Sequence, residues 1–245
     1  MAQRRGKLCR RVGRSEARRP EILQFERKGD VDMLKVVILG AAGQIARLAI
    51  EQFLEEQSGE LTLYLRKSNR LHKLASDRVR VMEGDVMDTA LLEKAVRGQD
   101  IVYANLAGDD IEDQAKSVVA ALDRAGVRRL IWISTLGIYD EVPGAFGKWN
   151  HEMLDDGYLG PYSSAATVIE SSDLEYTIVR PAWLTDKDEV DYELTQKGEP
   201  FKGTEVSRKS VADLVVKLAQ DPARDLRASL GIDKPGTVGD KPSWY

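Results

Sequence analysis

The chain has 245 residues, which suits one α/β domain near the upper limit of its size, with ordinary globular proportions of hydrophobic (42%) and charged (31%) residues. No run of apolar residues is long enough to span a membrane. With Cys9 as the single cysteine, the sequence excludes an internal disulfide and an all-cysteine metal site. The only histidines are His72 and His151, which argues against a histidine-rich zinc site, so we predict no metal ligands. We expect a cytoplasmic protein.

The net charge of −4 is divided unevenly along the chain. Residues 1–32 carry ten basic and five acidic side chains, whereas acidic side chains outnumber basic ones in residues 33–245. Because the basic segment lacks the apolar core of a secretory signal, we expect a disordered extension; a nucleic-acid-binding arm and an Arg-rich targeting segment are the alternatives. The body, 33–245, is acidic, which argues against a nucleic-acid partner because phosphate contacts need clustered cations.

From residue 34 onward, apolar strand-like runs alternate with helical periodicity. Strands are predicted at 34–40, 60–66, 78–85, 100–108, 127–135 and 174–181, and helices at 43–56, 89–98, 110–125, 162–172 and 207–222. We expect irregular structure over 136–160 and 184–204, a glycine stop at Gly98 and a helix cap at Ser207 or Ser210. The alternation predicts one domain, a parallel sheet with helices on both faces.

The motif "GAAGQIA" follows the first predicted strand and opens the first helix. Gly40 permits a tight turn, Gly43 lets backbone N–H groups approach a pyrophosphate at the helix N-terminus, and Ala46 keeps helix and strand close. The motif therefore predicts a dinucleotide site that includes Gln44 and Ile45. An ordinary strand–helix turn is the alternative.

The end of the second strand indicates which dinucleotide is bound. An NAD site would place a carboxylate there, whereas "LYLRKSNRL" places Arg66 and Lys67, followed by Asn69 and Arg70. A guanidinium can grip a 2′-phosphate, and this segment has no acid to repel it. We expect NADP(H) rather than NAD(H); a solvated basic loop is the alternative.

Two further strand ends extend this predicted site. Asp85 and Val86, in "GDVMD", follow the third strand, where a carboxylate can accept from the adenine amino group. Asp88 is better explained as a helix cap. Asn105 and Ala107, in "ANLAG", lie beside the expected path of the ribose.

The motifs "ILGAAGQIA", "LYLRKSNRL", "GDVMD", "ISTLGIYDE", "YTIVRPAWL" and "SRKSVADLVVKL" resemble the short-chain dehydrogenase/reductase superfamily, and more narrowly its atypical, NmrA-like branch. The first two also look like those of the biliverdin-IXβ/flavin reductases. The resemblance implies a single-domain Rossmann fold, a doubly wound parallel sheet with a small C-terminal segment on the substrate side.

The resemblance also implies catalytic roles. Ser134 matches the serine that hydrogen-bonds a substrate carbonyl, Tyr162 matches the family tyrosine, and Arg180 with Pro181 matches the segment near the nicotinamide. The family lysine, four residues after the tyrosine, is replaced by Ala166. Without its ammonium, Tyr162 is a poor base. Lys148 and His151 are the candidates to substitute for the lysine, and packing alone is the alternative role for Tyr162.

These observations predict an NADPH-dependent oxidoreductase that reduces a small conjugated acceptor, a quinone or flavin, since such acceptors take hydride with little acid catalysis. The segment from Leu136 to Tyr158 offers aromatic faces for that acceptor, at Tyr139, Phe146, Trp149 and Tyr158. An NADP(H)-binding redox sensor of NmrA-like type is the main alternative, and a nucleotide-sugar epimerase is weaker. A monomer and a homodimer both fit the sequence.

Overall fold

The computed structural model describes residues 33–154 and 157–245. The basic segment 1–32, with the extension expected there and the single cysteine, lies outside the described residues. Among the residues that the structure describes, no helix is both long and apolar enough to cross a membrane.

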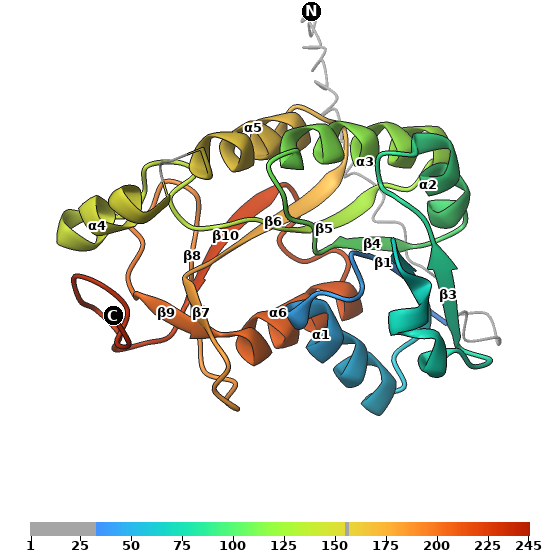
Figure 1. The fold of residues 1–245 in the computed structure, drawn as a ribbon, viewed down its shortest axis with the longest axis horizontal. Helices are drawn as coiled ribbons and strands as arrows, with labels where there is room; N and C mark the ends of the chain where they lie inside the picture. Colours follow the sequence, from blue (N-terminus) through green and yellow to red (C-terminus); the bar gives the residue numbers. More distant parts are fainter. Residues whose placement is uncertain (1–32, 155–156) are drawn as a thin grey trace, which may run out of the picture. The chain divides into compact units, whose positions relative to one another are not determined.

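The fold is built on an eight-stranded sheet (Figure 1) in the order β3-β2-β1-β4-β5-β6-β10-β8. Every neighbouring pair is parallel except β10 and β8, which are antiparallel. The strand order reverses between β1 and β4, and in open α/β sheets such a reversal opens a ligand crevice at the carboxyl ends of the strands. The strands are β1 Lys35–Leu39, β2 Glu60–Leu65, β3 Val79–Glu83, β4 Ile101–Ala104, β5 Arg129–Ile133, β6 Glu175–Pro181, β8 Glu193–Thr195 and β10 Ala228–Asp233.

Helices cover both faces of the sheet. In Figure 1, α1 (Gln44–Glu55) and α6 (Arg208–Gln220) lie on one face, and α2 (Thr89–Val96), α3 (Ile111–Ala125) and α5 (Leu159–Glu170) lie on the other. Alternate residues of β1 enter two separate cores, Val36 and Ile38 towards α1 and Val37 and Leu39 towards α3. The predicted doubly wound Rossmann architecture is therefore confirmed.

Helix ends agree with the predicted caps. The Asp88 carboxylate accepts from the Leu91 backbone N–H at 3.0 Å, and the Ser207 hydroxyl accepts from the Ser210 N–H at 2.9 Å. Gly98 follows the end of α2 with φ of +72°, a conformation that favours glycine. Two short 3₁₀ helices, η1 (Ser68–Arg70) and η2 (His72–Leu74), follow β2.

The irregular structure expected over 136–160 and 184–204 is wrong in part. Residues Gly144–Leu154 form a helix, α4, which was not predicted because glycine disfavours a helix. Packing explains the glycine at position 147, since a Cβ on Gly147 would lie 2.0 Å from the Val142 carbonyl oxygen. Two three-residue strands, β7 (Trp183–Thr185) and β9 (Glu205–Ser207), pair as a separate parallel sheet. Strands this short carry little sequence periodicity, and β8, also of three residues, was missed for the same reason. β10 has six residues and was missed because Gly231 interrupts its apolar run.

Candidate functional site

The glycine turn after β1 packs tightly against the end of β4. A Cβ on Gly40 would lie 2.2 Å from the backbone oxygen of Asn105, and a Cβ on Gly43 would lie 2.0 Å from the Asn105 side-chain nitrogen. Gly40 also has φ of +71°. Gly40 therefore requires glycine, and at Gly43 a larger residue would force the Asn105 side chain to move.

The N-terminus of α1 is open to an anion. Gly43 caps the helix without a side chain, its first turn contains no acidic residue, and the helix bonds begin only with the Arg47 N–H, which donates to the Gly43 carbonyl at 2.9 Å. The N–H groups before Arg47, including those of Gln44 and Ile45, have no helical acceptor. This arrangement fits a pyrophosphate at the positive end of the helix dipole.

A cavity of about 800 Å³ lies at the carboxyl ends of β1, β2, β3 and β4. Its size falls within the range for small-molecule and cofactor sites. Nine of the residues predicted to bind the dinucleotide line it: Gly40, Gly43, Gln44, Arg66, Lys67, Asp85, Val86, Asn105 and Ala107. The Ile45 side chain is buried in the core, so only its backbone can face the site.

Three cations line the cavity where β2 ends. Arg66, Lys67 and Arg70 are all exposed, as a group that receives a phosphate should be. The segment after β2 contains no acidic residue, as expected, but an acidic residue from a neighbouring strand lies against it. Glu83, at the end of neighbouring β3, accepts from the Ser68 N–H at 2.9 Å and from the Ser68 hydroxyl at 2.6 Å.

The floor of the cavity beside β3 is shaped by a tyrosine that sequence reasoning missed. The Tyr64 hydroxyl donates to the Asp85 carbonyl at 2.9 Å, and a Cβ on Gly84 would lie 2.2 Å from that hydroxyl. Burial, with Asp88 and Asp85 nearby, raises the pKa of Tyr64 to about 12, so the phenol stays protonated. The Asp85 carboxylate accepts from the Met87 N–H at 3.0 Å and lines the cavity.

The opposite wall is formed by the segment after β4. The Gln114 side chain donates to the Asp110 carboxylate at 2.6 Å and to the Ala107 carbonyl at 3.3 Å. Both Asp110 and Gln114 line the cavity, and neither was predicted. The signal in the sequence was a glutamine on the apolar stripe of α3, where a buried polar side chain needs partners.

Ser134 lies directly after β5 and outside the lining of this cavity. Its side chain is buried, and its hydroxyl has no hydrogen-bond partner among the described residues. The backbone N–H of Ser134 donates to the Val179 carbonyl at 2.8 Å, which fixes the residue against β6. An unpaired buried hydroxyl at a strand end is suited to bonding a substrate oxygen.

Tyr162 lies in the first turn of α5, and it is buried. Its pKa is raised, chiefly by burial and then by a hydrogen bond with Tyr158, and is lowered in part by the Gly108 backbone N–H. No cation contributes to this shift. Ala166 is fully buried in the same core. The phenol is therefore a hydrogen-bond donor at neutral pH, not a base.

The Arg180 side chain, predicted to lie near the nicotinamide, is held by partners within the core. It is fully buried, pairs with Glu141 through Nη1, and donates to the Ser229 hydroxyl through Nε at 3.1 Å. Its role in this structure is to tie β6 to β10 and to the segment after β5. Only the backbone of Arg180 and Pro181 remains available for the predicted contact.

The matching family model is described as NAD(P)H-binding, and it matches residues 40–222. This range runs from the glycine turn through α6 and includes the whole cavity. The chain belongs to this NAD(P)H-binding family.

Solved structures support this assignment. A Rossmann-fold NAD(P)-binding family protein from Shigella flexneri is 47% identical, with 86% of this chain and 98% of that chain covered and a TM-score of 0.74. A short-chain dehydrogenase/reductase from Veillonella parvula, solved in complex with NADP, is 34% identical, with 86% and 99% covered and a TM-score of 0.79. A curated relative, an uncharacterized sugar epimerase from Bacillus subtilis, is 25% identical over 80% of this chain and 92% of its own.

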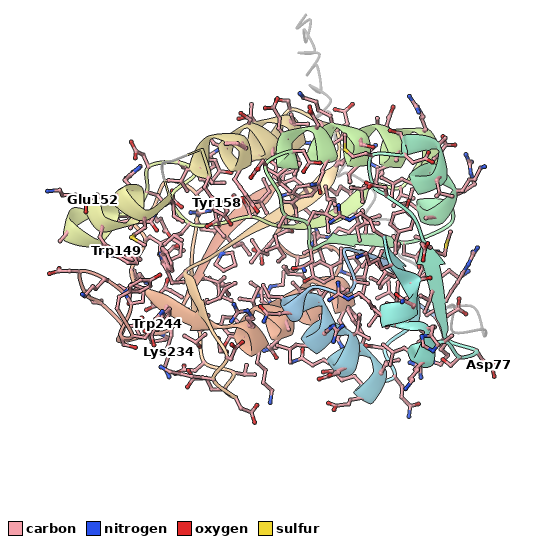
Figure 2. All side chains as sticks on the ribbon, viewed as in Figure 1. Asp77, Trp149, Glu152, Tyr158, Lys234 and Trp244 are labelled. Carbon is pink, nitrogen blue, oxygen red and sulfur yellow. The ribbon has the colours of Figure 1, made fainter. Side chains whose placement is uncertain are left out.

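In this NAD(P)H-binding protein, the predicted aromatic wall is divided. Tyr139 donates to the Glu170 carboxylate at 2.7 Å, and Tyr158 stacks on Tyr162. Trp149 of α4 meets Trp183 of β7 with ring centroids 4.8 Å apart, and both contact the ring of Tyr245. Figure 2 shows Trp149 and Trp244 on the side of the molecule where α4 and β9 lie.

Neither suggested substitute for the family lysine gains support. The Lys148 side chain is 80% exposed and faces Glu152 at 3.9 Å. The His151 ring lies 2.9 Å from the Asp140 carboxylate, and both belong to the segment that carries α4. Among the described residues, no cluster of three or more His, Cys, Asp or Glu side chains is arranged to hold a metal ion.

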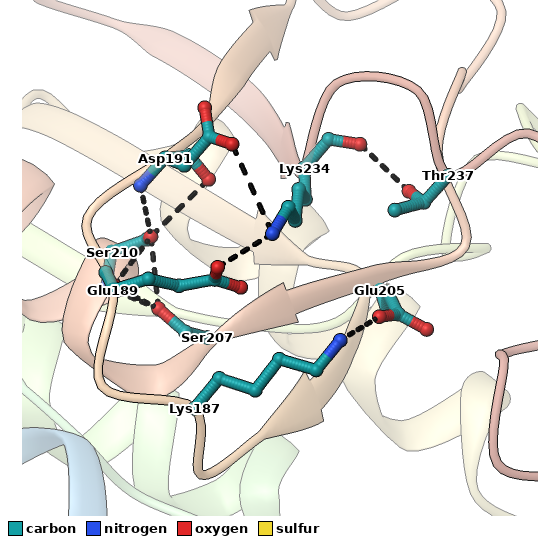
Figure 3. A network of polar contacts seen from close by, with 8 residues as sticks. All are labelled: Lys187, Glu189, Asp191, Glu205, Ser207, Ser210, Lys234 and Thr237. Carbon is teal, nitrogen blue, oxygen red and sulfur yellow. Dashed lines mark hydrogen bonds and ion pairs between the residues drawn. The ribbon is translucent and has the colours of Figure 1, made fainter.

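The segment from β7 to the C-terminal residues is fixed by a polar network (Figure 3). Lys234 donates to Glu189 at 2.5 Å, Lys187 donates to buried Glu205 at 2.7 Å, and the Ser207 hydroxyl donates to the Glu189 carbonyl at 2.6 Å. The network ties the two-stranded sheet to the turn after β10. These residues belong to the C-terminal segment, whose position on the substrate side stays a prediction.

Proposed function

We propose that this NAD(P)H-binding protein is an NADPH-dependent oxidoreductase that reduces a small conjugated acceptor, a quinone or a flavin, without a Tyr-Lys pair. The proposal adds two specifics to the reductase-like family: the phosphorylated cofactor and the class of acceptor. NADPH would supply the hydride.

The preference for NADPH rests on charge. Arg66, Lys67 and Arg70 face one cavity with the glycine turn, at the strand whose end carries an acid in NAD-specific sites. A guanidinium can bind a phosphate through two parallel hydrogen bonds. The complex of the Veillonella parvula protein with NADP is consistent with this cofactor.

The observation that carries the choice of acceptor is the state of Tyr162. Its phenol is buried, its pKa is raised, and Ala166 stands where the family cation belongs. Oxidising an alcohol requires a base that removes the hydroxyl proton, and this phenol cannot serve as one near neutral pH. A quinone or flavin accepts hydride readily, and the Ser134 hydroxyl can then donate a hydrogen bond to the developing oxyanion.

The test mixes the purified protein with NADPH and a panel of quinones and free flavins, and follows the loss of absorbance at the nicotinamide band. Turnover with one class of acceptor, weak turnover with NADH, and no oxidation of simple alcohols are expected. Turnover with alcohols that equals turnover with quinones would contradict the proposed acceptor class.

A dinucleotide-binding redox sensor of NmrA-like type is the second candidate. The same buried phenol favours it, because a protein that only binds NADP(H) needs no acid or base. Tight binding of NADPH in calorimetry, with no turnover across the panel, would select the sensor.

A further inference from the structure

Glu83 and Ser68 form a contact next to the predicted phosphate site that the sequence did not reveal. Ser68 begins η1 and lies between Lys67 and Arg70, both of which line the cavity. One oxygen of the Glu83 carboxylate, Oε2, accepts both the Ser68 N–H at 2.9 Å and the Ser68 hydroxyl at 2.6 Å. The carboxylate is exposed, so the contact can open without disturbing a core.

A backbone N–H and a hydroxyl from one residue, flanked by two cations, form a donor set that suits a phosphate oxygen. In this structure the Glu83 carboxylate accepts both of these Ser68 donors. The Ser68 hydroxyl and then the Ser68 N–H lower the pKa of Glu83, so the carboxylate is ionised at neutral pH. Glu83 thus places a negative charge beside the loop that carries Lys67 and Arg70, two cations that line the cavity.

We propose that Glu83 competes with the 2′-phosphate of NADP(H) for the two Ser68 donors and so reduces the preference for NADP(H) over NAD(H). This inference rests on the proposed function, because it concerns the same nucleotide site. The 2′-phosphate is attracted by Arg66, Lys67 and Arg70. It is repelled by Glu83, which also accepts the two Ser68 donors that the phosphate would use. An unphosphorylated ribose has no charge at this position and is affected little.

The inference is tested by binding alone, with two fragments of the cofactors as probes. Isothermal calorimetry compares 2′,5′-ADP, which carries the extra phosphate, with 5′-AMP, which does not. In E83Q the side chain keeps its size and loses its charge. Binding of 2′,5′-ADP is expected to tighten about five- to twentyfold, from the removal of one negative charge beside the cationic loop, and binding of 5′-AMP is expected to stay the same.

A matched control separates this local effect from the change in net charge. Glu60 is exposed at the opposite end of β2, so E60Q removes the same charge at a distance from the site. E60Q is expected to leave the ratio of the two affinities unchanged. An equal gain in E60Q and E83Q would overturn the inference, because general charge would then explain it.

A second variant tests the role of Ser68 directly. S68A is expected to change 2′,5′-ADP affinity little in the wild-type background, where Glu83 holds the hydroxyl, and to cancel part of the gain in the E83Q background. Equal effects of S68A in both backgrounds would contradict the competition. Tighter binding of 2′,5′-ADP by wild type than by E83Q would also overturn it, because Glu83 would then orient Ser68 for the phosphate.

The two proposals fail in different ways. If wild type binds neither 5′-AMP nor 2′,5′-ADP, the nucleotide site and the proposed function fail together. If both fragments bind and E83Q leaves their ratio unchanged, only the role of Glu83 is refuted.

Discussion

The ring of Tyr158 stacks on the ring of Tyr162, with centroids 4.6 Å apart and planes inclined by 27°. Tyr158 immediately precedes α5, so the stacked pair lies at the N-terminal end of that helix. The space around the Tyr162 phenol is therefore filled by a second phenol, whose hydrogen bond raises the pKa of Tyr162 further. A neighbouring ammonium would have the opposite effect.

Restoring the family cation with A166K is expected to fail as a repair. The Ala166 side chain is fully buried in the core cluster that also contains Val118 and Ile169, so an unpaired ammonium there should lower the free energy of unfolding by about 3 kcal/mol or more. Urea unfolding of A166K measures this loss, and A166M controls for size without charge. Normal stability together with faster carbonyl reduction would instead show that Tyr162 is placed for catalysis.

Arg66 is the residue on which cofactor preference is expected to depend most directly. R66E reverses a charge that lines the cavity, so the KM for NADPH is expected to rise about tenfold or more while the KM for NADH changes little. Steady-state kinetics with both cofactors checks this. R80E makes the same change at an exposed position near the start of β3 and should leave both values unchanged. An unchanged preference in R66E would refute the role of Arg66.

Ser134 is expected to matter for turnover and not for stability. S134A should lower kcat with quinones by about 10- to 100-fold with the KM for NADPH unchanged, because the hydroxyl acts on the acceptor. Since that hydroxyl has no partner among the described residues, its removal should not lower the free energy of unfolding.

Ser229 provides the contrast for this measurement. Its hydroxyl accepts from the Arg180 guanidinium at 3.1 Å and lies 3.2 Å from the Tyr139 oxygen, to which it donates because the Tyr139 proton goes to Glu170. S229A should therefore lower stability by about 1–3 kcal/mol. Equal losses of stability in S134A and S229A would indicate that Ser134 has a structural partner.

The parts of the fold that were predictable have long, regular patterns. The continuous apolar run of β1 and the apolar stripe of α3 predicted a sheet covered by helices. The two glycines Gly40 and Gly43 predicted the position of the turn between β1 and α1. Helix α4 was not predictable, because Gly144 and Gly147 weigh against a helix and only tertiary packing of Phe146 and Asn150 supports it.

The candidate site was predictable where its residues follow strand ends and not where they meet across strands. Arg66 and Asp85 follow directly from the position of β2 and β3. The pairing of Glu83 with Ser68, fifteen residues earlier, depends on the register of two parallel strands. The burial of Arg180 against Glu141 depends on a loop that has no periodicity.

The Arg180–Glu141 pair is expected to stabilise the fold without contributing to nucleotide binding. Both side chains are almost completely buried, and Glu141 also accepts from the Gly137 and Tyr139 N–H groups. E141Q leaves a buried guanidinium without its counter-charge, so a loss of about 3–5 kcal/mol in unfolding free energy is expected. E152Q, in the exposed pair with Lys148, should cause no measurable loss. A weaker affinity of folded E141Q for NADPH would contradict this prediction and would indicate that Arg180 contributes to cofactor binding.

Asp233, the final residue of β10, is expected to make stability depend on pH in an unusual direction. The carboxyl is fully buried; burial, and then Glu193, raise its pKa to about 6, although the Gly203 N–H donates to it at 2.9 Å. The unfolded chain has the ordinary value of about 4, so between these values the folded protein binds the proton more tightly. Asp233 therefore stabilises the fold at low pH, and this contribution is lost as the pH rises from about 4 to about 6.

D233N removes this titration and keeps an oxygen that can accept from Gly203. At pH 8 it is expected to be more stable than wild type by about 1–3 kcal/mol, and below pH 4 the difference should disappear. Urea midpoints of both proteins at several pH values measure this, and the difference between the two curves cancels the other carboxylates. A D233N variant that is less stable than wild type at pH 8 would mean that the Gly203 bond to the ionised carboxylate outweighs the cost of burying its charge.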